Sequence, residues 1–184
     1  MNEITNHAEL TVVKKLEGQY KKERFMMYGF YVLILVAFLL ILNAMGLMLL
    51  ALIVVPVYPF LLSKVIIPAT FYLVDREEKM DISGGTLTLS TILGKKKQKI
   101  LVKMKVSSFD AIVPYNDEYK AQCDAFQYDK RYEAVSTMSN PEIYCAYGTN
   151  DYEEKVICFF EVTNKALRVM KFLNKNTVVT EVSR

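Results

Sequence analysis

The chain has 184 residues, 52% of them hydrophobic, and a formal net charge of only +3. So small a charge excludes the strongly basic surface of a typical nucleic-acid-binding domain. The single histidine, His7, is distant in sequence from the cysteines Cys123, Cys145 and Cys158. These residues form no familiar metal-ligand or Cys-His spacing, so we expect no metal, no cofactor and no nucleic-acid partner. We interpret the cysteines as reduced thiols buried in a core.

Residues 1–24 form a basic N-terminal segment. Between residues 8 and 23, apolar side chains recur at steps of three or four, and lysines occupy the remaining positions. This pattern predicts an amphipathic helix, weakened by Gly18. Two placements are open. The helix lies in the lipid headgroup layer with its lysines toward anionic lipid, or it packs on the soluble domain.

Residues 25–67 are dominated by an apolar run, because the sequence between Arg24 and Lys64 contains no Asp, Glu, Lys, Arg or His. As one helix this run would reach roughly 58 Å, nearly twice the ~30 Å hydrocarbon core of a bilayer. It therefore predicts two membrane helices, residues 25–42 and 47–67, joined by a turn at 43–46. Pro56 and Pro59 should kink the second helix. The lack of ionisable groups nevertheless favours an anchor over a transport route.

Basic and aromatic residues flank the two predicted spans, whereas the turn between them carries no charge. We predict membrane-interface anchors at Lys21, Lys22, Arg24, Tyr28 and Lys64. Since Lys and Arg accumulate on the cytoplasmic side, both termini are predicted to be cytoplasmic. A cleaved signal peptide is disfavoured, because the run is far longer than an h-region and no small-residue cleavage site ends it.

Residues 68–184 are numerous enough for one soluble domain with its own core. Residues 116–130 are polar with scattered aromatics, and they predict a loop or a short helix. Short β-type runs predict strands at residues 70–74, 80–83, 109–113 and 132–138.

Two hairpins are predicted within this domain. In the first, strands at residues 86–93 and 100–106 flank a lysine-rich turn, with Ile100, Val102, Met104 and Val106 on one face. In the second, residues 143–147 and 156–162 flank a loop at 148–151, and Cys145 and Cys158 are expected opposite each other if the register is centred on that loop. A reduced core pair is the favoured interpretation, and a redox switch is the alternative.

A final helix follows the second hairpin. Thr163 or Asn164 can cap it, a stripe from Ala166 to Leu173 is apolar, and Asn174 is a suitable stop. Six or seven short strands before one amphipathic helix predict a strongly bent sheet or barrel, closed at one end by the helix. The predicted fold class is thus a membrane α-helical hairpin plus a soluble, mainly-β domain of the pleckstrin-homology-like (PH-like) kind.

Three stretches carry a resemblance to a known family: residues 70–74, the run GGTLTLSTILGKKKQKILVKMKVSSFDAIVP at 84–114, and VICFFEVTNKALRVMKFL at 156–173. On these stretches the chain resembles a family of small membrane proteins from clostridia and related Firmicutes. In that family a short basic N-terminus precedes two membrane helices and a cytoplasmic PH-like domain. The resemblance implies a multi-pass protein of the bacterial cell membrane. It carries no catalytic residues, and residues 116–141 depart most from its pattern.

The predicted soluble domain lacks the parts of common catalytic sites. It has no histidine, no Gly-rich phosphate loop and none of the usual hydrolase motifs, so we do not expect an enzyme. The sequence therefore predicts a membrane-anchored, non-enzymatic binding or scaffold protein.

The most distinctive local feature of the soluble domain is a basic turn with Lys95, Lys96, Lys97 and Lys99. Beside a membrane anchor, these lysines would meet anionic lipid headgroups of the inner leaflet. The alternative is a solvated turn that protects a strand edge. A competing hypothesis is a protein-interaction module, or a subunit of a membrane complex, that binds a membrane or cytoplasmic protein through a sheet edge or the groove beside the C-terminal helix.

Overall fold

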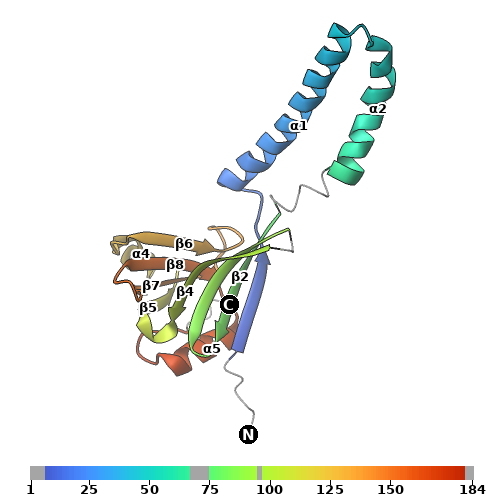
Figure 1. Ribbon diagram of the computed structural model, residues 1–184. Coiled ribbons are helices and arrows are strands. Elements are labelled where there is room, and N and C mark those ends of the chain that lie inside the picture. Colours follow the sequence, from blue (N-terminus) through green and yellow to red (C-terminus); the bar gives the residue numbers. More distant parts are fainter. Residues whose placement is uncertain (1–6, 67–74, 95–96, 181–184) are drawn as a thin grey trace. The chain divides into compact units, whose positions relative to one another are not determined.

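The structure is a computed structural model that describes residues 7–66, 75–94 and 97–180. It divides into two compact units, which we describe separately (Figure 1). The helical unit comprises residues 15–75, and the β unit combines residues 1–14 with residues 76–184. The strand predicted at residues 70–74 lies outside the described residues.

The helical unit is a hairpin. Helix α1 (Gly18–Ala44) is followed by a 3-10 turn η1 (Met48–Leu50), helix α2 (Ala51–Leu61) and a π-helical turn η2 (Leu62–Ile66). At the end of α1 the amide of Leu47 donates to the carbonyl of Leu42 (2.9 Å), and that of Gly46 to Asn43 (3.0 Å). These bonds form a Schellman motif, whose left-handed position Gly46 fills with φ +71°. The motif overlaps the turn predicted at 43–46, although α1 continues through Ala44.

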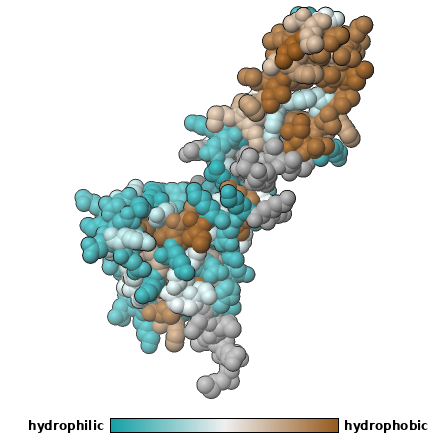
Figure 2. Space-filling view, viewed as in Figure 1, coloured by the Kyte–Doolittle hydropathy of each residue, from teal (hydrophilic) through white to brown (hydrophobic). Residues whose placement is uncertain are grey.

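Both helices of the hairpin are long and apolar enough to cross a membrane. The candidate spans are Tyr20–Ala44, with a mean hydropathy of 2.6, and Met48–Ile66, with 2.2. Figure 2 shows hydrophobic side chains covering this unit, and only 11% and 0% of the two most apolar windows are buried. A hydrogen bond links the two helices: the Tyr58 hydroxyl donates to the backbone carbonyl of Tyr31 at 2.8 Å.

The first sheet of the β unit has the order β1-β2-β3-β4, with antiparallel neighbours throughout. Its strands are β1 (His7–Val13), β2 (Arg76–Ser83), β3 (Thr86–Leu93) and β4 (Lys97–Lys105). The amphipathic helix predicted from residue 8 is therefore wrong for β1. Ala8, Leu10 and Val12 alternate toward the core, and the partner strand β2 lies more than sixty residues away in sequence. No local periodicity reveals such a partner.

The second sheet has the order β5-β7-β8-β6, in which only β6 is parallel to its neighbour β8. Its strands are β5 (Phe109–Pro114), β6 (Lys130–Ala134), β7 (Ile143–Thr149) and β8 (Lys155–Glu161). The strands predicted at 109–113, 143–147 and 156–162 are confirmed, whereas the one predicted at 132–138 begins and ends earlier. A short helix, α4 (Lys120–Ala125), lies within the segment for which a loop or short helix is predicted.

Apolar clusters cover both faces of the second sheet. One cluster joins it to the first sheet and to the C-terminal helix α5 (Asn164–Leu173), whereas the other packs with Cys123 of α4. Strands β7 and β8 are consequently buried along nearly their whole length. The predicted cap of α5 is confirmed, because the Thr163 hydroxyl accepts from the amide of Ala166 at 3.2 Å.

Two register details differ from the sequence-based expectation. Pairing between β3 and β4 skips Leu101, so Ile100 turns to the opposite face from Val102 and is 58% exposed. Cys145 pairs with Phe159, one residue beyond the expected partner Cys158, and the two thiols therefore lie on opposite faces of the sheet. The prediction that the cysteines are buried is confirmed, since all three are free and buried.

Candidate functional site

The lysine-rich turn between β3 and β4 lies at one particular end of the first sheet. Arg76, at the start of β2, pairs with Leu93 of β3, which in turn pairs with Lys97 of β4. Strand β1 also ends there, because the amide of Lys14 donates to the carbonyl of Arg76 at 3.0 Å. The turn therefore shares its sheet end with both connections to the helical unit. We call this the connected end.

Of the four lysines predicted as a headgroup site, the structure describes two. Lys97 and Lys99 lie on β4 and are exposed. Lys95 and Lys96 lie outside the described residues. Lys99 pairs with Thr91 across the β3–β4 ladder, so it belongs to the sheet row that also contains Glu78.

Glu78 is a buried carboxylate at the connected end. Only 5% of its surface is exposed, and the Thr91 hydroxyl donates to its Oε2 at 2.7 Å. Burial raises the pKa of Glu78. The hydrogen bond from Thr91 and the positive charges of Lys14 and Arg76 each lower that pKa, but they offset the effect of burial only in part. This residue is hard to recognise as buried from the sequence because it lies in a charged stretch, residues 75–79. Glu78 lies two residues before Met80 and four before Ile82, both of which are buried. This spacing places the Glu78 side chain on the same, core-facing side of β2.

The predicted membrane-interface anchors lie near the two chain ends of the helical hairpin. Lys21, Lys22, Arg24 and Tyr28 are in the N-terminal turns of α1, and Lys64 is in η2. Lys64, Lys21, Lys22 and Tyr28 are exposed, whereas Arg24 is half-buried. Among the described residues of α1, η1, α2 and η2, the charged groups are thus confined to the ends that continue into the β unit.

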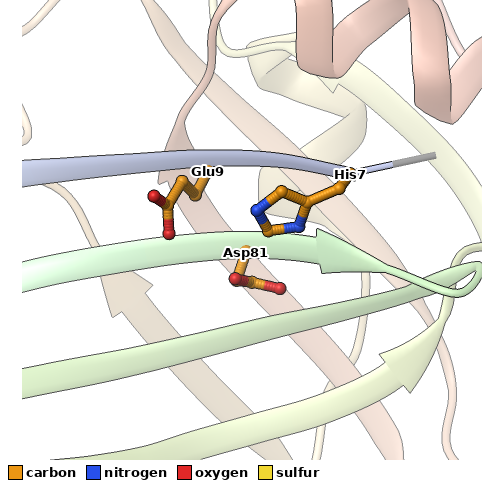
Figure 3. Close-up of side chains that lie close together, drawn as sticks. All are labelled: His7, Glu9 and Asp81. Carbon is orange, nitrogen blue, oxygen red and sulfur yellow. The ribbon is translucent and has the colours of Figure 1, made fainter. Parts of the chain in front are cut away.

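A cluster of possible metal donors lies on the outer face of the first sheet (Figure 3). Donor atoms of His7, Glu9 and Asp81 lie within 4.8 Å of one another. Glu9 and Asp81 are directly paired, and the ammonium of Lys79 lies 2.6 Å from one carboxylate and 4.0 Å from the other. Lys79 lowers the pKa of Glu9 through this bond. The lysine already supplies the positive charge that two opposed acids need, so the cluster is an ion-pair network.

Two of the three thiols, Cys145 and Cys158, are poor candidates for nucleophiles because their pKa values are raised. Burial raises the pKa of Cys158 to about 12, and a hydrogen bond with Cys123, together with burial, raises the pKa of Cys145. A thiol reacts as its thiolate, and groups with such raised pKa values remain protonated near neutral pH. The hydrogen bond with Cys145 lowers the pKa of the third, Cys123, but that thiol is fully buried. Cys123 and Cys145 belong to the same apolar cluster, between α4 and β7.

A shallow groove of about 490 Å³ follows the outer edge of β4. Ile100 and Leu101 line it from β4, Tyr132 from β6, and Tyr152 from the turn after β7. Tyr152 is 84% exposed. Among the described residues, β4 pairs only with β3, so its other edge is open to a further strand.

Comparison of the chain with protein-family models, with curated protein sequences and with solved structures found no significant match in any of the three. The candidate surfaces are therefore interpreted from their own geometry.

Proposed function

We propose that the protein is a non-enzymatic, two-span membrane protein whose β unit is a PH-like domain at the inner leaflet. Its lysine-rich turn would contact anionic lipid headgroups there. The observation that carries this proposal is the position of the turn at the connected end of the sheet, beside Val13 and Arg76. Two four-stranded sheets followed by one C-terminal helix support the PH-like assignment.

The pairing of β1 with β2 supports the proposed topology. These strands precede and follow the helical hairpin, yet they are hydrogen-bonded neighbours. Residues before the first span and after the second must then lie on the same side of the bilayer. The basic residues at the hairpin ends favour the cytoplasmic side.

The chain length between β1 and α1 limits how far the connected end can lie from the bilayer. From Val13 to Gly18 the extended backbone spans at most roughly 18 Å. The helix rises about 10 Å more before the apolar run begins at Phe25. Attraction to an anionic leaflet is worth about 1 kcal/mol per lysine and decays within a Debye length of about 8 Å. A tether this short keeps the lysines at a high effective concentration near the leaflet.

The test uses the full chain in vesicles. A spin label is attached at Ile100→Cys, since Ile100 is exposed and the native cysteines are buried. All vesicles contain the same amount of a nickel-chelating lipid, and its bound Ni²⁺ enhances the spin relaxation of any label close to the headgroups. We expect stronger relaxation in vesicles that contain phosphatidylglycerol than in pure phosphatidylcholine, and loss of the difference when Lys95, Lys96, Lys97 and Lys99 become Glu.

A matched control reverses four other charges. Lys165, Arg168, Lys171 and Lys175 are exposed on or just after α5. Their conversion to Glu changes the net charge equally and should leave the relaxation intact. Equal loss in both variants would mean that only net charge matters, and no lipid dependence in the unmodified chain would refute the lipid contact.

A second candidate function is partner binding through the open edge of β4. The unpaired edge, beside exposed Ile100 and Tyr152, favours addition of an extended segment from another protein. In this case a stoichiometric protein partner should co-purify from detergent extract and be lost on Ile100→Lys, but retained on Lys155→Glu at another exposed site. Recovery of lipid alone would favour the first function.

A further inference from the structure

A second basic surface lies on α5 and the turn that follows it. Residues 164–180 contain no Asp or Glu, and their four cations are Lys165, Arg168, Lys171 and Lys175. All four are exposed. Within the described part of the chain, no carboxylate forms an ion pair with any of them. Within residues 164–180, this surface is therefore uniformly basic.

These cations border a groove rather than a flat surface. The groove has a volume of about 630 Å³ and runs between α5 and Thr180. Arg168, Lys171 and Lys175 line it, and the Lys171 ammonium donates to the Thr180 hydroxyl at 3.0 Å. Phe172 forms part of the wall and is 58% exposed, a large apolar side chain among the cations. The surface thus combines positive charge with an aromatic contact.

The groove is remote from the connected end of the first sheet. Leu173, at the end of α5, lies beside Gly85 in the β2–β3 turn, 3.7 Å from where a Cβ would stand. The Asn174 side chain donates to the carbonyls of Val106 (3.2 Å) and Phe109 (3.3 Å). Gly85 and Val106 mark the sheet end opposite Val13 and Arg76. The α5 groove and the lysine-rich turn are therefore at opposite ends of the first sheet.

Self-association through this face is disfavoured. A symmetric dimer would place the same patch against itself, and four cations without an acid would repel their copies. The positive charge of this surface is complementary to an acidic ligand.

We infer that the α5 groove binds a short acidic segment of a partner protein, with carboxylates on the cations and one apolar side chain against Phe172. Helix α5 is about 15 Å long, which four or five extended residues would match. This inference is independent of the lysine-rich turn, since the two surfaces share no residue.

The test uses the full chain in nanodiscs of phosphatidylcholine, so that no anionic lipid competes. The probe is a fluorescein-labelled peptide in which Asp and Glu flank a central Phe, and binding is followed by fluorescence anisotropy. We expect saturable binding that weakens about tenfold or more in the triple variant R168E/K171E/K175E. Phe172→Ser should weaken it about threefold or more without a change in charge.

Two controls separate this site from general charge attraction. The turn variant K97E/K99E should bind the peptide as the unmodified chain does, and a peptide with Lys in place of Asp and Glu should not bind. The inference is overturned if no saturable binding occurs, if the turn variant loses as much affinity as the α5 variant, or if an excess of phosphatidylglycerol nanodiscs displaces the peptide.

Discussion

Gly148, in strand β7, has no room for even a methyl side chain. A Cβ there would lie 2.5 Å from the carbonyl oxygen of Ser108 and 2.9 Å from the Cα of Phe109. Both are backbone atoms, so no side-chain rotation relieves the clash. Gly148→Ala should destabilise the β unit by about 1–3 kcal/mol.

Thermal unfolding of the full chain in detergent, followed by circular dichroism, measures this effect. Thr149→Ala, at the exposed next position of β7, is the control. An unchanged midpoint for Gly148→Ala would contradict the close approach of β5 and β7.

Glu78 should make stability depend on pH. Its pKa in the folded state is raised above the ordinary value of 4.5, mainly by burial. The folded state thus holds the proton more tightly than the unfolded state, and this contribution to stability is lost as pH rises from 4.5 through the raised pKa. Glu78→Gln keeps an acceptor for Thr91 without the charge, so it should unfold at a higher temperature than the unmodified chain near neutral pH.

Unfolding midpoints measured from acidic to neutral pH check this expectation. The difference between Glu78→Gln and the unmodified chain should shrink toward pH 4.5. Glu77→Gln, at the neighbouring position whose side chain faces the other side of β2, serves as the control. If Glu78→Gln were less stable than the unmodified chain near neutral pH but not at acidic pH, the ionised carboxylate would be shown to stabilise the fold.

At the scale of elements, the sequence predicts well what depends on neighbouring residues. The β3–β4 hairpin alternates at period two on both sides of a glycine turn, and α5 has its apolar stripe and its cap within eleven residues. Strand β1 was mispredicted because its partner β2 is distant in sequence. The skip at Leu101 and the offset of Cys145 are one-residue register effects, which composition does not reveal.

The candidate sites follow the same division. The lysine-rich turn is visible in the sequence, but its place beside Val13 and Arg76 follows from the pairing of strands. The acid-free stretch at 164–180 is likewise visible, whereas its groove requires Thr180 to lie beside α5.

Loss of the α5 cap should destabilise the β unit. In Thr163→Ala the amide of Ala166 loses its acceptor, which should cost about 1 kcal/mol. Thr163→Ser retains the hydroxyl and should recover most of the stability. Urea unfolding of the full chain compares the three proteins, and an equal loss in both variants would mean that the methyl group of Thr163, not its cap, stabilises the helix.

At the scale of the whole molecule, the β unit is discontinuous in sequence. Residues 76–184 alone would lack β1 and expose the edge of β2, which invites aggregation. The amide of Lys14 and the carbonyl of Arg76 are hydrogen-bonded at 3.0 Å, so a short turn can replace the helices between them. A chain with residues 7–14 joined by Asn-Gly to residues 76–184 should be a soluble monomer by size-exclusion chromatography, whereas residues 76–184 alone should not. Equal behaviour of the two would contradict a structural role for β1.

Accessibility in intact cells tests the proposed topology. Met45→Cys lies in the turn between the helices and should react with a membrane-impermeant maleimide. Tyr152→Cys lies at an 84% exposed position of the β unit and should react only after lysis. The unmodified chain is the blank, because its cysteines are buried. The reverse pattern would place the β unit outside the cell.

The pairing of β1 with β2 also sets an order of events during synthesis. Strand β1 leaves the ribosome before either apolar helix has been made, and its partner follows both of them. The strand must therefore wait, unpaired, until the second helix is complete. Under the proposed topology, a nascent chain that inserted only one helix would leave β1 and β2 on opposite sides of the bilayer, where they could not pair. Under that topology, the first sheet could therefore form only after both helices had inserted, so folding of the β unit would depend on insertion of the whole hairpin.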